Sequence, residues 1–425
     1  MIVAGERGIV ISLALQVDIL RKDDVPMRYQ SVRMQTQKRV LVVLSVAVGL
    51  VSFSWANYAA VLPLVIADLG LSGTEAGIVY SAYFVGYVAA VLPAGMIADR
   101  HSARRLIGTT AVGTGICSVA FALLTTGVIT GSLFRLLAGA CFAGVYVPGM
   151  RLLTDWFESS ERGWAIGIYV GILSLGSGVA YPVTSGVATL TDWRVALVVT
   201  SAVAIPAGVA VLWLAADYPG TTGRSVAFDV SVFTERRYLY VTTAYAGHNW
   251  ELFGVQNWIV AFLVVTPAIA ATASPTVTAG ILAGLLVLLG APGNVVGGRL
   301  SDSVGRIRTS GGALAASGCL TLALGLIEWT TLFFLGSAIV VYGVVLAADS
   351  APLSTAMTEL ADDEHVGTAL AGQSLLGFVP GMISPVVFGA ALDLAGYTLA
   401  FGTLAAGAVV GLGALWLLRR SLHRG

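Results

Sequence analysis

An eleven-residue charged segment occurs twice in this chain, as GMIADRHSARR at residues 95–105 and as GRLSDSVGRIR at residues 298–308. Asp99 and Asp302, which hold the same place in the two copies, are 203 residues apart. Each copy lies between two long apolar runs. This spacing indicates a tandem duplication, so we expect two halves with the same internal order of helices.

The composition places both halves in a membrane. Hydrophobic residues make up 57% of the chain and charged residues 11%, whereas soluble domains carry about a quarter charged residues. A membrane-spanning helix needs roughly 20 mainly apolar residues, and twelve runs satisfy this: residues 40–63, 74–95, 106–126, 130–152, 163–188, 194–216, 238–266, 277–298, 310–328, 331–356, 367–391 and 397–418. We predict an all-α polytopic membrane protein with twelve transmembrane helices in two pseudo-symmetric six-helix bundles. Membrane β-barrels have short alternating segments instead.

Charge placement predicts the orientation of these spans. Of the 23 Lys and Arg residues, only Arg194 falls on the side opposite both termini, and Arg135 lies within a span. The positive-inside rule therefore predicts cytoplasmic termini and a multi-pass protein of the cytoplasmic membrane. The formal net charge of zero argues against nucleic acid as a partner.

The spans divide the chain into five segments. We predict an N-terminal cytoplasmic tail, an N-terminal bundle, a cytoplasmic linker, a C-terminal bundle and a short cytoplasmic tail, at residues 1–37, 38–216, 217–237, 238–418 and 419–425. The first tail has no stretch long enough to cross a membrane, and Met27 and Met34 are alternative start positions. All three cysteines fall inside apolar runs, so we predict no metal site, disulfide or cofactor.

The repeated loop resembles a known signature. It is similar to the G-x-x-x-D-R-x-G-R-R motif that follows helices 2 and 8 in the major facilitator superfamily of secondary transporters. The twelve spans, the central linker and the repeat extend the resemblance over residues 40–418. In the first copy Ser102 replaces the second glycine, and in the second copy Ser303 replaces the arginine.

By resemblance, this loop latches the two halves together on the cytoplasmic side when the transporter faces outward. The matching positions are Gly95, Asp99, Arg100, Arg104, Arg105, Gly298, Asp302 and Arg306. The physical basis is a carboxylate at a helix N-terminus that accepts hydrogen bonds from neighbouring arginines. Because the second copy departs further from the motif, we expect an asymmetric latch. The alternative is that these are solvated charges that only set topology.

Arg135 begins RLLAG, which resembles the R-x-x-x-G pattern of helix 4 in the same family. An arginine within a span costs about 2.5–3.5 kcal/mol on insertion scales, so it should face water, a carboxylate or the substrate. On a helical wheel it shares one face with Gly139, Phe142 and Tyr146, and we assign this face to the central cavity. Alternatively, Arg135 extends to the lipid headgroups.

The seventh span contains the largest polar cluster within the membrane. His248, Asn249, Glu251 and Gln256 fall within an arc of about 160°, and the resemblance directs this arc inward, because helices 1, 4, 7 and 10 line the cavity in that family. His248 and Glu251 are three residues apart and can share a proton. Burial favours the protonated form of a carboxyl, as a proton carrier requires. Alternatively, the pair closes helix 7 against helix 11, or Glu251 pairs with Arg135.

Helices 10 and 1 supply the remaining candidates for the pathway. Tyr342 and Asp349 are seven residues apart and share a face, with Asp349 either a ligand or part of a latch. Asn57 and Tyr58 either line the pathway or pack in the core.

We therefore predict a secondary transporter that moves a small polar or anionic organic solute by alternating access, with proton-coupled uptake. The expected partners are this solute, protons and the lipid bilayer, with a monomer as the expected state. An enzyme is not expected, because neither a nucleophile–base set nor a metal cluster is evident. Proton-coupled efflux remains open, although the fifth-helix signature of drug antiporters is not intact, and so does a membrane sensor of the same fold. The sequence leaves the cargo and the direction of transport undecided.

Overall fold

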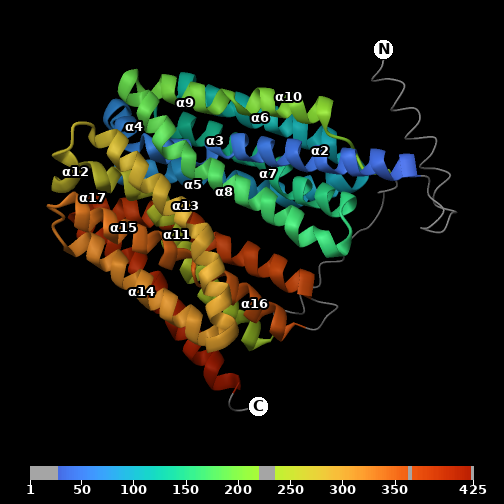
Figure 1. Cartoon of the computed structure of the whole chain (residues 1–425). Helices are drawn as coiled ribbons and strands as arrows, with labels where there is room; N and C mark the ends of the chain where they lie inside the picture. Colours follow the sequence, from blue (N-terminus) through green and yellow to red (C-terminus); the bar gives the residue numbers. More distant parts are fainter. Residues whose placement is uncertain (1–26, 220–234, 362–365, 423–425) are drawn as a thin grey trace.

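The computed structural model describes residues 27–219, 235–361 and 366–422, and all regular secondary structure in these residues is helical. Figure 1 shows the helices in two groups, one from each half of the chain. The predicted all-α fold is confirmed. Residues 1–26 of the predicted tail and residues 220–234 of the predicted linker lie outside the described residues.

The first group, the N half, contains nine helices within the described residues. They are α2 (Met27–Val51), α3 (Phe53–Ala60), α4 (Leu62–Leu69), α5 (Gly73–Arg100), α6 (Ala103–Leu124), α7 (Val128–Trp156), α8 (Ser159–Leu190), α9 (Trp193–Ala202) and α10 (Ala204–Leu214). The first span is broken at Ser52 and Val61, and α9 and α10 together form the sixth span.

The second group, the C half, contains the remaining helices. They are α11 (Arg236–Val265), α12 (Pro267–Ala270), α13 (Pro275–Val304), α14 (Arg306–Leu326), α15 (Leu332–Ala347), α16 (Ser350–Leu360) and α17 (Val366–Leu422). The tenth span is α15 followed by α16, with a break at Ala348 and Asp349. The backbone of α17 turns at Ala395 and Gly396, so it holds the last two spans.

Ten helical stretches among the described residues are long and apolar enough to cross a membrane. The stretch from Gly372 to Leu422 holds two spans because of the turn at Gly396, and the polar α11 is the remaining one. This accounts for the twelve predicted helices. The first helix of the described residues begins at Met27, so the second part of the predicted tail is helical.

The two halves meet closely at one end and diverge at the other. In Figure 1 they lie side by side near α4 and α12, and they separate toward α16 and the beginning of α2. We name the joined end, which carries Gly73 and Asp393, the Asp393 end. The other end, which carries Asp99 and Asp302, is the Asp99 end.

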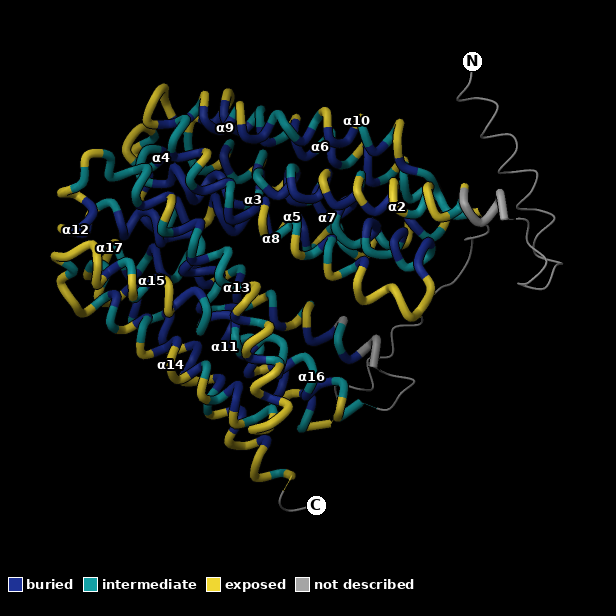
Figure 2. The backbone as a smooth tube through the Cα atoms, viewed as in Figure 1, coloured by how far each residue is buried: buried dark blue, intermediate teal, exposed yellow. Residues whose placement is uncertain are grey.

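Glycines allow the backbones of the two halves to touch along two seams. In the seam between α5 and α17, a Cβ atom at Gly389 would overlap the carbonyl oxygen of Gly73, and in the seam between α8 and α13, one at Gly284 would lie 2.5 Å from the carbonyl oxygen of Gly178. Buried residues concentrate between and within the halves, and exposed residues cover the outer helices (Figure 2). Small residues are the usual means of close helix approach in membranes.

Candidate functional site

A cavity of about 200 Å³ lies between the halves. The N half contributes Trp55, Ser177 and Tyr181 to its wall, and the C half contributes Gln256 and Asn294. Its polar lining groups are hydroxyls, amides and the indole of Trp55, and none of its lining residues is charged. Such a lining can hydrogen-bond to the uncharged polar groups of a small organic molecule.

Gln256 is the member of the predicted polar arc that lines this cavity. Its backbone carbonyl accepts a hydrogen bond of 2.7 Å from the Tyr181 hydroxyl, which joins α11 to α8 across the halves. The other three members have different surroundings. The expectation that one face of α11 turns the whole arc toward the cavity is therefore wrong.

Glu251 faces α14 and α15 within the C half and is fully buried. Its Oε2 accepts a hydrogen bond of 2.9 Å from Ser317, and its Oε1 accepts bonds from Thr321 (2.5 Å) and Tyr342 (3.0 Å). Three hydroxyl donors replace the hydration that a carboxyl loses on burial. The alternative pairing of Glu251 with Arg135 is wrong, because the described partners of Glu251 are these three hydroxyls and Arg135 donates to the carbonyl of Ser54 instead.

His248 and Asp349 form a second buried polar group. The Nδ1 atom of His248 lies 2.8 Å from Oδ1 of Asp349, and both side chains are nearly inaccessible to solvent. Tyr245 stacks on the imidazole with the ring centroids 5.7 Å apart. This contact ties α11 to the break between α15 and α16. Tyr342 and Asp349 thus face α11 together, as their spacing predicts, but they contact different residues of it.

Asn249 faces α17 instead. Its Nδ2 donates to the carbonyl of Tyr245 over 3.0 Å, and it lies next to Gly377 and Gly381. The polar arc of α11 is therefore shared among α8, α14, α15 and α17, because each turn of a central helix meets a different neighbour.

Arg135 lies in a cage of three tyrosine rings. Its guanidinium carbon is 4.4 Å from the ring centroid of Tyr83, 5.3 Å from that of Tyr58 and 6.0 Å from that of Tyr80. Nη1 donates to the carbonyl of Ser54 over 2.7 Å. Only 2% of the residue is exposed, so it does not reach the lipid headgroups. Cation–π contacts of a desolvated arginine are worth about 2 kcal/mol or more.

Two further donors of Arg135, Nε and Nη2, have no hydrogen-bond partner among the described residues. The hydroxyls of Tyr80 and Tyr83 are likewise unpaired there. Neither Arg135 nor Gly139, Phe142 and Tyr146 of the same face lines the cavity, so the assignment of this face to the cavity is wrong. The indole of Trp55, which lines the cavity, packs edge-on against Phe84 and Phe142, with ring centroids 4.8 and 5.6 Å away. The cage thus lies behind an aromatic wall of the cavity.

The remaining predicted pathway residues make contacts within the N half. Asn57 donates from Nδ2 to the hydroxyls of Thr200 (3.1 Å) and Ser201 (2.9 Å). Tyr58 donates to the carbonyl of Ala76 over 3.1 Å. Tyr146 stacks between Phe142 and Tyr169. These contacts join α3 to α9 and α5, and α7 to α8.

The first copy of the repeated loop is bonded within the N half. Asp99 pairs with Arg151 at the end of α7. Ser102 accepts a hydrogen bond from the backbone of Arg105, which caps α6, and Asp217 accepts one of 2.8 Å from the backbone of Arg104. A Cβ atom at Gly95 would meet nothing within 4 Å, and Arg100 is exposed. These contacts do not join the two halves.

The second copy is bonded within the C half. Arg306 donates from Nη1 to Asp302 over 2.5 Å, and its Nη2 lies 2.9 Å from Glu359 of α16. A Cβ atom at Gly298 would have one ordinary contact, 3.8 Å from Ala351. The two loops therefore use different partners, Arg151 in one half and Glu359 in the other. Because each loop pairs within its own half, these contacts are compatible with the separation of the halves at the Asp99 end.

Several site residues were not predicted from the sequence: Ser177, Asn294, Ser317, Thr321, Arg151, Glu359 and Asp393. Ser317 and Thr321 carried a usable signal, because two hydroxyls four residues apart on a predicted helix share a face. Arg151 was counted only as a topology charge. Nothing in the spacing marked Asn294 or Ser177.

Comparisons with known proteins agree with this architecture. The family model described as Major Facilitator Superfamily matches residues 44–266 and 252–424. A probable sulfoacetate transporter of Cupriavidus necator is 25% identical over 411 residues, which are 90% of this chain and 93% of that protein. The membrane sensor protein UhpC of Escherichia coli is 28% identical over 148 residues, 34% of this chain and 32% of the sensor.

Among solved structures, an inward-facing and occupied bacterial homologue of the human lysosomal transporter Spinster has a TM-score of 0.76. The match covers 91% of this chain and 97% of that chain at 16% identity. At this identity the likeness concerns the fold.

Proposed function

Because the chain belongs to the Major Facilitator Superfamily, we propose that it takes up a small polar or anionic organic solute by proton-coupled alternating access. The family match and the transporter relatives support solute transport as such. The nature of the solute, the coupling ion and the direction are our proposal. The halves would rock about the cavity that they share.

The cavity between the halves is the observation on which this proposal rests. It takes its polar groups from both halves, and the two glycine seams join the halves toward the Asp393 end. A solute bound there would contact both halves at once. Rocking of one half against the other would then change the end at which the solute can leave.

The charge on the solute would be balanced by Arg135. Its two unpaired donors, together with the hydroxyls of Tyr80 and Tyr83, suit the oxygen atoms of a carboxylate or sulfonate. Trp55 would have to move before an anionic group in the cavity reached the cage. The short helix α3, which carries Trp55 between the breaks at Ser52 and Val61, supports such a movement.

Protons would be carried by the buried acids of the C half. Glu251 is our first candidate because its described partners are hydroxyls rather than a cation, so it can hold or release a proton without breaking an ion pair. The His248–Asp349 pair is the second candidate. Both groups adjoin α15, which lines the cavity through Gly343 and Leu346.

The Asp99 end would face the cytoplasm, because the arginines of both repeated loops lie there. We propose the cytoplasmic membrane as the location and a monomer as the working unit. The described conformation would then be inward-facing.

Purified protein in proteoliposomes should accumulate a labelled solute when an inward proton gradient is imposed. Sulfoacetate is the first probe, followed by other small organic anions and by uncharged polyols of the same size. We expect gradient-driven accumulation of at least one anion that a protonophore abolishes. The control is the Arg135→Met variant, which should lose anions before polyols.

Each alternative predicts a different result in the same vesicles. Efflux would give accumulation only when the proton gradient is reversed. A sensor, as the match to UhpC suggests for part of the chain, would bind a probe without moving it. Thermal stabilisation by a probe with no transport in either direction would contradict our proposal.

Asp99→Asn should lower the turnover number several-fold and leave solute affinity nearly unchanged. Asp99 lies at the end of the bundle, paired with Arg151, so its loss should change the balance between conformations rather than the binding site. Initial rates and equilibrium binding measure the two quantities separately. Asp302→Asn is the matched comparison and should have the smaller effect, because Arg306 keeps Glu359. Equal turnover in Asp99→Asn and wild type would make Asp99 a topology charge only.

A further inference from the structure

One carboxylate joins the two halves at the Asp393 end. Asp393 of α17 accepts hydrogen bonds from the backbone N–H of Gly73 (2.7 Å), the backbone N–H of Thr74 (2.8 Å) and the Thr74 hydroxyl (2.8 Å). Gly73 and Thr74 are the first residues of α5, in the opposite half. The carboxylate of one half therefore caps a helix of the other.

The chemistry of this contact makes it strong for its size. The first N–H groups of a helix have no partner within the helix, and the positive end of the helix dipole favours a negative charge there. Hydrogen bonds with an ionised acceptor are roughly twice as strong as those between neutral groups. Asp393 combines these effects, since it accepts from the N–H groups of the first two residues of α5.

The beginning of α5 is held firmly within its own half. Ser72 and Glu75 form a capping box, with Glu75 Oε2 accepting from the Ser72 N–H over 2.9 Å and Ser72 Oγ accepting from the Glu75 N–H over 3.2 Å. Separation of the halves would therefore break the bonds of Asp393 rather than fray the helix.

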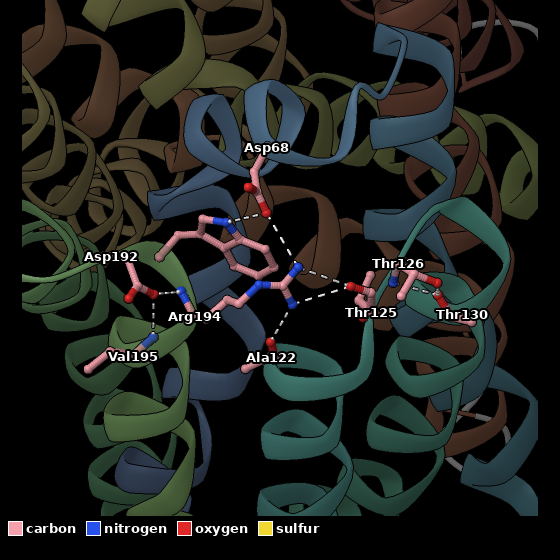
Figure 3. Close-up of polar contacts among 9 residues, drawn as sticks. Asp68, Ala122, Thr125, Thr126, Thr130, Asp192, Arg194 and Val195 are labelled. Carbon is pink, nitrogen blue, oxygen red and sulfur yellow. Dashed lines mark hydrogen bonds and ion pairs between the residues drawn. The ribbon is translucent and has the colours of Figure 1, made fainter.

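The preceding segment is fixed as well. Asp68 of α4 accepts hydrogen bonds from Trp193 (3.1 Å) and Arg194 (3.3 Å), and Arg194 also donates to the carbonyls of Ala122 and Thr125, as Figure 3 shows. Arg194 thus binds the ends of α4, α6 and α9 into one unit. The sequence placed this arginine alone on its side of the membrane, and the structure uses it to stiffen the N half.

Among the described residues, the second seam has no matching carboxylate. The 203-residue repeat relates Gly73 to Thr276 and Asp393 to Leu190, which is 86% exposed. The α8–α13 seam instead contains the close contact of Gly280 with Ser185. The charged contact across the Asp393 end is thus a feature of one seam, and the duplication by itself did not require it.

We propose that Asp393 acts as a latch, which holds the two halves together at the Asp393 end. Its three bonds to Gly73 and Thr74 must then break whenever that end opens. This inference rests on the proposed alternating-access cycle, but not on the identity of the solute or the coupling ion. Removal of the carboxylate should shift the conformational balance toward the state that is open at the Asp393 end.

Spin-label distances across each end test this proposal directly. In a background in which Cys117, Cys141 and Cys319 are replaced by Ala, one label pair is placed at Ile129 and Phe333, which are 81% and 73% exposed at the starts of α7 and α15. A second pair, at Ser159 and Arg308, reports on the Asp99 end. Double electron–electron resonance then measures the distances between the two labels of each pair, for the full chain in nanodiscs without solute.

Asp393→Asn should lengthen the distance between residues 129 and 333 and shorten the distance between residues 159 and 308. The ratio of open to closed populations at the Asp393 end should rise by roughly tenfold, because an amide presents one acceptor where the carboxylate presents two. Thr74→Val removes only the hydroxyl bond and should shift the populations in the same direction by a smaller factor.

Asp192→Asn is the matched control. Asp192 caps α9 at the same end, by accepting from the backbone N–H groups of Arg194 (2.8 Å) and Val195 (3.0 Å), but both partners lie in its own half. Asp192→Asn removes a negative charge at this end but keeps Oδ1, the oxygen that accepts both bonds. It should therefore leave the fold and both distance distributions as in wild type.

Unchanged distributions in folded Asp393→Asn, or an equal shift in Asp192→Asn, would overturn the latch. Failure of the proposed function would look different. The protein would then show no solute transport in vesicles, while the distances would still respond to Asp393→Asn.

Discussion

Glu251→Gln should abolish proton-driven accumulation of the solute and preserve the exchange of labelled for unlabelled solute. Gln has the shape of Glu and can still hydrogen-bond with Ser317, Thr321 and Tyr342, whose hydroxyls rotate to donate or accept. It cannot take up or release a proton. Exchange requires no net proton movement, so it should continue at close to the wild-type rate.

The measurement compares accumulation and counterflow in the same vesicles. His248→Asn is the matched control, because it also removes a buried titratable group from α11. We expect it to shift the pH dependence of transport without abolishing accumulation, since it leaves the Glu251 carboxyl in place.

Two outcomes would contradict the role of Glu251. If Glu251→Gln still accumulates solute against a gradient, the carrier is elsewhere, and the His248–Asp349 pair is the next candidate. If exchange is lost as well, Glu251 is a structural residue that holds α11 to α14 and α15.

Gly139→Ala should destabilise the N half strongly. A Cβ atom at Gly139 would overlap the carbonyl oxygen of Tyr83, and one at Gly86 would overlap that of Leu136, so α5 and α7 are in backbone contact at both points. Neither backbone can move aside without separating the helices. Overpacking of this kind costs about 1–3 kcal/mol and occasionally more. Because Gly139 lies one turn from Arg135, the tyrosine cage should also be displaced.

Thermal unfolding followed by fluorescence-detected size exclusion measures this effect. Gly167→Ala is the control, because a Cβ atom at that helical position would meet nothing within 4 Å. It should be neutral or slightly stabilising, since Ala is favoured over Gly in a helix by about 1 kcal/mol. Equal melting temperatures for Gly139→Ala and wild type would show that α5 and α7 are not in close contact at this point.

The prediction for α11 shows where sequence-based reasoning stopped. His248, Asn249, Glu251 and Gln256 lie on one side of the helix, as their spacing requires. The sequence did not reveal that four different helices contact this side. Glu251 was expected at the cavity and lies against α14 and α15, whereas Gln256 reaches the cavity as expected.

Arg135 repeats this pattern in the N half. Its cost in a membrane predicted that it faces water, a carboxylate or the substrate, but among the described residues it faces three tyrosine rings and the carbonyl of Ser54. The three tyrosines that surround it come from α3 and α5, and no local pattern around residue 135 indicates them. Asp393 is a still clearer case, because its partners are more than 300 positions away and belong to the other half.

The sequence by itself determined the membrane class, the twelve spans and the two related halves. These properties depend on hydropathy summed over about 20 residues and on an internal repeat, and both can be read along the chain. Tertiary structure alone decided which side of each helix faces the cavity, where Arg135 and Glu251 find their partners, and that Asp393 joins the halves. The physical reason is that a span is apolar on nearly every side, so its rotation about its own axis depends on contacts with neighbouring helices. The sequence of a single span does not specify those contacts.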